Sequence, residues 1–185
     1  MGIPNVLNVR NGARNIVTAG VFTALLIGAQ FALSGIAGVE FVTVLLLVFC
    51  YNCGVRQGML VANAFTILRC VLFGFMPTVI LLYAIYYNLF AVLFGLVGKA
   101  FKRKYSIAKH AALVLLAVAM TALFTVIDNI ITPLFFEYST QAAKAYWLTS
   151  LYTAVPQMLC ALITTLCLFP PLFKLLQVNH IGIKE

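Results

Sequence analysis

The amino-acid sequence predicts an all-α integral membrane protein, a bundle of six transmembrane helices with both termini in the cytoplasm. The first observation is composition: 64% of the 185 residues are hydrophobic and 9% are charged, against about 25% charged residues in soluble domains. The second is that the apolar residues form continuous runs, with room for about six spans of roughly 20 residues each. The third is that the basic residues gather in alternate loops. A chain of this length is expected to form a single membrane domain, residues 1–185.

The breaks between apolar runs place the expected spans at about 15–33, 39–54, 58–74, 78–97, 110–131 and 146–169. Glycines, serine and prolines mark the turns at 34–38, 52–58, 74–77 and 132–133. The second run is short for a span, so we expect it to extend into its flanks or to thin the bilayer locally. In the sixth span Pro156 predicts a kink, and Pro170 with Pro171 predicts the end of the helix. Residues 172–185 then form a short amphipathic tail.

The orientation follows from counting basic residues in the loops. With six spans, one side of the bilayer receives Arg10, Arg14, Arg56, the five basic residues of 99–109, Lys174 and Lys184. The loops on the other side carry only Lys144. The positive-inside rule therefore places both termini in the cytoplasm. The net charge of +8 is explained by this topology, and no nucleic-acid partner is expected.

Three ionisable residues lie in or at the ends of apolar spans, where a charge is costly and therefore a functional candidate. Glu40 begins the second span, Arg69 lies one turn from the outer end of the third, and Asp128 lies one turn from the outer end of the fifth. All three are thus predicted in the outer half of the bilayer. They could line a binding pocket, or Arg69 could pair with either carboxylate to hold the helices together. The two interpretations are compatible.

Further candidates for the wall of an outward-facing pocket are aromatic and amide side chains of the fourth and sixth spans. Tyr83 and Tyr87 share one helix face with Asn88 beside them, while Trp147 and Gln157 lie along the sixth span. An interfacial aromatic belt is an alternative explanation for Trp147. It explains Asn88 and Gln157 less well, because those two positions lie deeper.

Small residues recur every fourth position along the first span, at Gly20, Ala24, Gly28 and Ala32. On a helix this spacing forms a ridge with almost no side chain, which lets another helix approach closely in lipid. The sequence therefore predicts that this face docks onto a partner within the membrane.

No catalytic, metal or cofactor site is predicted from the remaining motifs. Residues 95–100 lack both the first glycine and the Ser/Thr of a phosphate-binding loop. Cys50 and Cys53 form a lone C-x-x-C with no second pair and no nearby histidine, for which a metal or redox role is a minor alternative. The chain is therefore not expected to be an enzyme.

The chain resembles the substrate-binding (S) components of energy-coupling factor (ECF) vitamin transporters. The resemblance lies in Arg14 followed by the stretch AGVFTAL at 19–25, in six short spans within one small chain, and in cytoplasmic termini. In that family a small-xxx-small motif on the first helix docks onto a transmembrane scaffold subunit. Gly20 and Ala24 occupy the matching positions here, with glycine in place of the usual first alanine.

The resemblance implies a plasma-membrane ABC importer in which two ATPase subunits on other chains hydrolyse ATP. The S component would bind its vitamin from outside, topple in the membrane on docking and release the ligand inside. Residues 38–43 and the third and fourth spans are most similar to cobalamin-type members, while pantothenate, other water-soluble vitamins and a queuosine-type precursor stay open. One arginine against two carboxylates argues against a strongly anionic ligand. Alternatives are a self-sufficient carrier or channel subunit that uses Arg69 and Asp128 for ion coupling, and an assembly subunit without a ligand.

Overall fold

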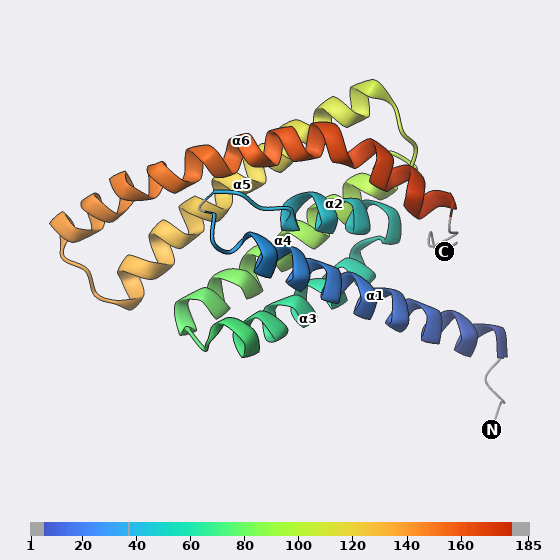
Figure 1. Cartoon of the computed structure of the whole chain (residues 1–185), viewed down its shortest axis with the longest axis horizontal. Coiled ribbons are helices and arrows are strands. Elements are labelled where there is room, and N and C mark those ends of the chain that lie inside the picture. Colours follow the sequence, from blue (N-terminus) through green and yellow to red (C-terminus); the bar gives the residue numbers. More distant parts are fainter. Residues whose placement is uncertain (1–5, 37, 179–185) are drawn as a thin grey trace.

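The computed structural model describes residues 6–36 and 38–178, and this part of the chain folds into six helices (Figure 1). Their bounds are α1 Val6–Leu33, α2 Val42–Cys53, α3 Val55–Phe73, α4 Pro77–Ala100, α5 Ile107–Phe135 and α6 Thr140–Val178. Every helix except α2 is long and apolar enough to cross a bilayer. The predicted fold class is confirmed, and the chain is a multi-pass membrane protein.

Five of the helices extend beyond the expected spans, and α5 continues through Pro133 to Phe135, so the predicted turn at 132–133 is wrong. Helix α1 begins at Val6, well before the expected start at 15. Helix α6 continues through Pro170 and Pro171 to Val178, so the prediction that these prolines end the helix is wrong. A proline removes one backbone hydrogen bond and bends a helix, but a membrane helix packed against its neighbours tolerates this. The expected tail is therefore helical as far as 178, and residues 1–5 and 179–185 lie outside the described residues.

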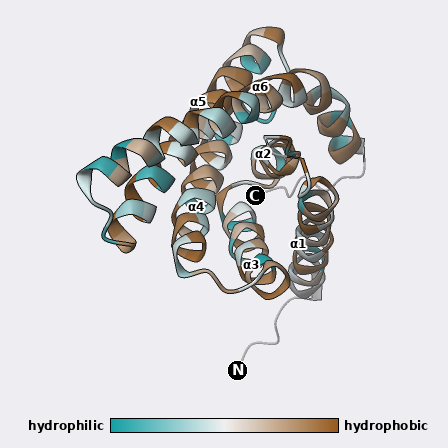
Figure 2. Cartoon of the chain, turned by 60° about the vertical axis from the view of Figure 1, so that its left-hand side comes forward, coloured by the Kyte–Doolittle hydropathy of each residue, from teal (hydrophilic) through white to brown (hydrophobic). Residues whose placement is uncertain are grey.

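Helix α2 is the centre of the bundle. It contacts all five other helices, and eleven of its twelve residues are buried. Its sequence is apolar on every side, the pattern of a helix enclosed by protein. Figure 2 shows α2 surrounded by the other helices, whose surfaces are mostly hydrophobic. Helices α5 and α6 form a long antiparallel pair on one side of α2, and α1, α3 and α4 pack together on the other (Figure 1).

One end of the bundle collects the junctions that carry most of the basic residues. Gly98 of α4 packs directly against the backbone of Tyr51 near the end of α2, and the Tyr51 hydroxyl donates to the carbonyl of Lys104 at 3.0 Å. The Gln177 amide of α6 donates to the carbonyl of Arg103 at 3.1 Å. The α2–α3 junction, the α4–α5 junction and the end of α6 therefore meet here. This basic end is the one that the sequence assigns to the cytoplasm.

Candidate ligand-binding site

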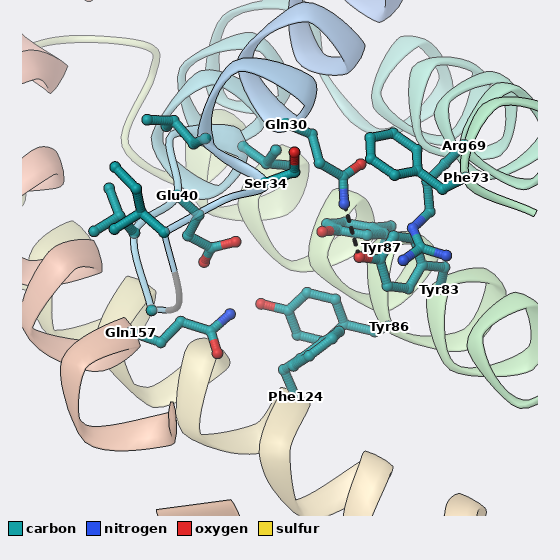
Figure 3. A pocket seen from close by; sticks show the side chains of 15 residues that line it. Gln30, Ser34, Glu40, Arg69, Phe73, Tyr83, Tyr86, Tyr87, Phe124 and Gln157 are labelled. Carbon is teal, nitrogen blue, oxygen red and sulfur yellow. Dashed lines mark hydrogen bonds between the residues drawn. The ribbon is translucent and has the colours of Figure 1, made fainter. Parts of the chain in front are cut away.

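The candidate site is a cavity of about 350 Å³ at the end of the bundle opposite the basic end. Helix α2 has 12 residues and is thus about 18 Å long, whereas the bilayer core is about 30 Å thick. Because the last residues of α2 reach the basic end, the length by which α2 falls short of the bilayer core lies at the other end. Residues 34–36 and 38–41, which connect α1 to α2, lie here together with the cavity. The side chains drawn in Figure 3 come from all six helices and from this connecting segment.

Glu40 lies just before α2, and α6 fixes its backbone. The Glu40 N–H donates to the Cys160 Sγ atom at 3.4 Å, and the same thiol donates to the Glu40 carbonyl at 3.3 Å. Within the same segment Gly38 has φ +80°, and a Cβ atom there would lie 2.7 Å from the Cβ of Pro156. Only glycine combines this backbone conformation with such close contact. The segment is thereby held against α6 with the Glu40 carboxylate directed into the cavity (Figure 3).

The Glu40 side chain is held from two sides. The Thr43 hydroxyl donates to Glu40 Oε1 at 2.7 Å, and the Gln157 amide lies across from the carboxylate (Figure 3). Loss of solvent around Glu40 raises its pKa above the usual 4.5, while hydrogen bonds from Thr43 and Gln157 partly oppose the increase. The site therefore contains a carboxyl group that binds a proton more readily than one in water.

Arg69 of α3 lies on the other side of the tyrosines from Glu40 and has no carboxylate within salt-bridge distance among the described residues. Its guanidinium carbon is 4.6 Å from the centroid of the Tyr83 ring and 5.5 Å from that of Phe73. Cation–π contacts with these rings position the charge. The buried Nε atom of Arg69 has no hydrogen-bond partner within the described part of the chain. Arg69 thus brings a positive charge and an unused donor to the cavity.

Aromatic side chains form the wall between these two charged groups. Tyr83, Tyr86 and Tyr87 of α4 are buried, and their rings make edge contacts with centroids 5.0 Å apart for both Tyr83–Tyr87 and Tyr86–Tyr87. Phe124 of α5 packs on Tyr86 with centroids 4.9 Å apart. The Gln30 amide of α1 donates to the Tyr83 hydroxyl at 3.0 Å. Flat apolar surface and a few polar atoms thus line one cavity, which is the usual composition of a small-molecule site.

Of the eight predicted ligand-binding residues, the structure brings five together in this cavity: Glu40, Arg69, Tyr83, Tyr87 and Gln157. Asn88 lies elsewhere. Its amide exchanges two hydrogen bonds of 3.0 Å with the amide of Asn63, which joins α4 to α3. This reciprocal pair satisfies both side chains without a ligand.

Asp128 and Trp147 also lie outside the residues that line the cavity. The two carboxylate oxygens of Asp128 accept from the hydroxyls of Thr132 and Tyr146, each at 2.8 Å, so this group joins α5 to α6. Arg69 pairs with neither Asp128 nor Glu40 in the described structure. Trp147 remains 43% exposed on α6, as expected for an interfacial aromatic residue.

The sequence argument missed five lining residues whose side chains Figure 3 labels: Gln30, Ser34, Phe73, Tyr86 and Phe124. A signal for Gln30 was present, because an amide in an otherwise apolar span calls for a polar partner. Tyr86 could have been found as a neighbour of Tyr83 at i+3 on the same helix. Nothing in the sequence distinguishes Phe73 and Phe124 from ordinary core residues.

The predicted docking face of α1 is open. Gly20, Ala24, Gly28 and Ala32 are all exposed, and Cβ atoms built on the two glycines would meet nothing within 4 Å. The helix packs on α2 and α3 through a different face that includes Ala19, Thr23 and Leu26. The helical repeat places the two faces about 150° apart. Within the described part of the chain, the small residues therefore make no close helix contact.

The cavity offers one cationic side chain, one acidic side chain and three tyrosines, a set suited to binding an organic molecule rather than to holding a metal. No group of three or more His, Cys, Asp or Glu residues is arranged to hold a metal ion among residues 6–36 and 38–178. Comparisons with protein-family models, with curated proteins and with solved structures find no match to this chain.

Proposed function

We propose that this protein is the membrane-embedded substrate-binding subunit of an ECF-type ABC importer in the plasma membrane, and that it takes up a water-soluble vitamin. The observation that carries the proposal is the cavity at the end of the bundle remote from the basic residues, in which Arg69 has no carboxylate partner among residues 6–36 and 38–178. A partly buried cation without a counterion is costly in a protein that has only to hold its own helices together. A ligand that fills the cavity and contacts Arg69 offsets that cost.

The open face of α1 supports the second half of the proposal, which is that the chain works with partners. Exposed Gly20 and Gly28 allow a second helix to approach the α1 backbone closely. In the proposal this helix belongs to a transmembrane scaffold subunit, and two further subunits hydrolyse ATP. Ligand binding and docking then use different faces of α1, because Gln30 and Leu33 line the cavity whereas the four small residues are exposed.

Which vitamin is bound stays a prediction. The resemblance of residues 38–43 to cobalamin-type members points to cobalamin, whereas a cavity of about 350 Å³ is smaller than a corrinoid, so smaller water-soluble vitamins are tested beside it. The alternative of a self-sufficient carrier that couples ions through Arg69 and Asp128 finds no support in the contacts, because Asp128 is satisfied by Thr132 and Tyr146.

The test measures ligand binding and vitamin uptake separately in Ala24→Leu, a substitution that adds a bulky side chain to the docking face of α1. The matched control is Ala119→Leu, because Ala119 is equally exposed on the outer surface of α5. We expect Ala24→Leu to abolish vitamin uptake by cells that contain the whole transporter, while the purified subunit still binds its ligand. Ala119→Leu should leave both unchanged. Normal uptake by Ala24→Leu would overturn the docking proposal, and uptake by liposomes that contain this chain alone would favour the carrier.

A further inference from the structure

We propose that the cavity selects a compact amphoteric molecule, with an anionic group at Arg69, a flat apolar body against the tyrosines, and an amine or amide group at Glu40. The inference rests on the proposed function in taking the cavity as the ligand site, and it goes further by naming the chemical class of the ligand.

The anionic end of the ligand follows from Arg69. Its guanidinium is positioned by Tyr83 and Phe73, so it is held in place without a carboxylate. Its Nε atom is buried and has no acceptor in the described structure. A guanidinium presents several N–H donors in one plane and binds a carboxylate or phosphate through two parallel hydrogen bonds. An anionic ligand group supplies the missing acceptors and the missing counterion in one step.

The opposite end of the ligand follows from Glu40. Thr43 occupies Oε1, and the carboxylate and the Gln157 side chain face the cavity together from the other side of the tyrosines (Figure 3). A carboxylate accepts hydrogen bonds and pairs with a cation, and the amide of Gln157 both donates and accepts. This end therefore recognises a group that carries N–H donors, such as an ammonium or an amide, and repels a second anion.

The wall between these ends determines the body of the ligand. Tyr83, Tyr86, Tyr87 and Phe124 line the cavity with ring faces and edges. Aromatic rings pack well against another flat ring and bury much area at little cost in conformational entropy. The buried Gln30 Oε1 atom has no partner within the described residues and offers one more acceptor beside Tyr83. A planar, mostly apolar body with a polar edge fits these surroundings.

The size of the cavity limits the ligand further. A volume of about 350 Å³ lies at the lower end of the range of roughly 300–1,000 Å³ for small-molecule sites. A corrinoid, with its macrocycle and nucleotide tail, is far larger than this space. Asp128 lies outside the cavity, so the lining contains one arginine and one acidic residue. This balance corresponds to a ligand with one anionic group and one donor group, rather than to a strongly anionic one.

The test compares three probes that share one ring and differ only at its ends. Para-(aminomethyl)benzoate carries both charged groups, para-toluate lacks the amine, and para-methylbenzylamine lacks the carboxylate. Dissociation constants are measured with the purified, detergent-solubilised full chain, with Arg69→Gln and with Glu40→Gln. Hydrogen bonds to charged groups lead us to expect each single-ended probe to bind wild type about tenfold or more weakly than the double-ended probe.

Each variant is tested through the ratio of the dissociation constants of two probes. This ratio does not depend on how much of the variant is folded. In Arg69→Gln the advantage of the double-ended probe over para-methylbenzylamine should fall to about one, and in Glu40→Gln its advantage over para-toluate should do the same. Equal binding of all three probes to wild type, or unchanged ratios in the variants, would overturn the inference. Binding of cobalamin with none of the probes would overturn it and leave the proposed function standing. If neither the probes nor any vitamin bind, and cells lacking the chain take up vitamins normally, both proposals fail.

Discussion

Replacing Arg69 with methionine tests whether this charge serves a ligand or the fold. The substitution removes two cation–π contacts, with Tyr83 and Phe73, worth about 0.5–1 kcal/mol each. It also removes a buried Nε donor that lacks a partner, which costs the native state about 1–3 kcal/mol. The free energy of unfolding should therefore change by between about −1 and +2 kcal/mol, while ligand binding is lost. If Arg69 instead completed a buried ion pair, removing it would cost about 3–5 kcal/mol.

Denaturant-induced unfolding in mixed micelles measures the free energy of unfolding of wild type and of Arg69→Met. Ligand binding is followed on the same preparations. Asp128→Asn is the control, because Asp128 joins α5 to α6 away from the cavity. It should lose some stability and keep its binding. The double variant Arg69→Met with Glu40→Gln adds a check, since residues that do not interact have additive effects to within about 0.5 kcal/mol. A loss of 3 kcal/mol or more in Arg69→Met, or a strong coupling to Glu40, would refute the reasoning.

Four further predictions concern three glycines and the pH dependence of stability. Gly95→Ala should destabilise the protein by about 1–3 kcal/mol or more, because its Cβ would lie 2.6 Å from the backbone nitrogen of Val55. Gly20→Ala, on the open face of α1, should instead add about 0.5–1 kcal/mol, and unfolding of the two variants side by side checks both. Gly38→Ala should weaken ligand binding at least tenfold, measured by titration, because φ +80° costs alanine about 1–2 kcal/mol and its Cβ would strike α6. Glu40 has a raised pKa in the folded protein, so its contribution to stability is complete below pH 4.5 and is lost as the pH rises through the folded value. Glu40→Gln should therefore flatten the decline in melting temperature above pH 4.5, and an identical pH profile in the variant would contradict this assignment.

The helices and about a third of the residues that line the cavity were predictable from the sequence, because they depend on local pattern and on the cost of charge in lipid. Continuous apolar runs predict helices whatever their partners are. Arg69 and Glu40 stand out because an ionisable group near a bilayer needs a reason to be there. Counting spans then places both at the same end of the bundle, and the structure brings them into one cavity.

The contacts that removed Asn88 and Asp128 from the site could not be predicted, because each needs a partner from another helix. Asn88 is satisfied only if α3 and α4 pack in the register that brings Asn63 opposite. Asp128 depends on Tyr146, which lies across the α5–α6 turn. The prediction that Pro170 and Pro171 end α6 failed for a related reason. Packing of α6 against α2 and α5 outweighs the local preference of proline to end a helix.

The shortness of α2 determines how the cavity beside it can change in size. Because the other helices enclose α2, its missing turns are hidden from lipid and the surrounding bilayer has no need to deform. Adding a turn at Val42 would shrink the cavity, and removing one would enlarge it. The lipid-facing surface of the surrounding helices, including the docking face of α1, would be unchanged. The length of α2 can therefore change the size of the proposed ligand site without changing the surface that meets lipid.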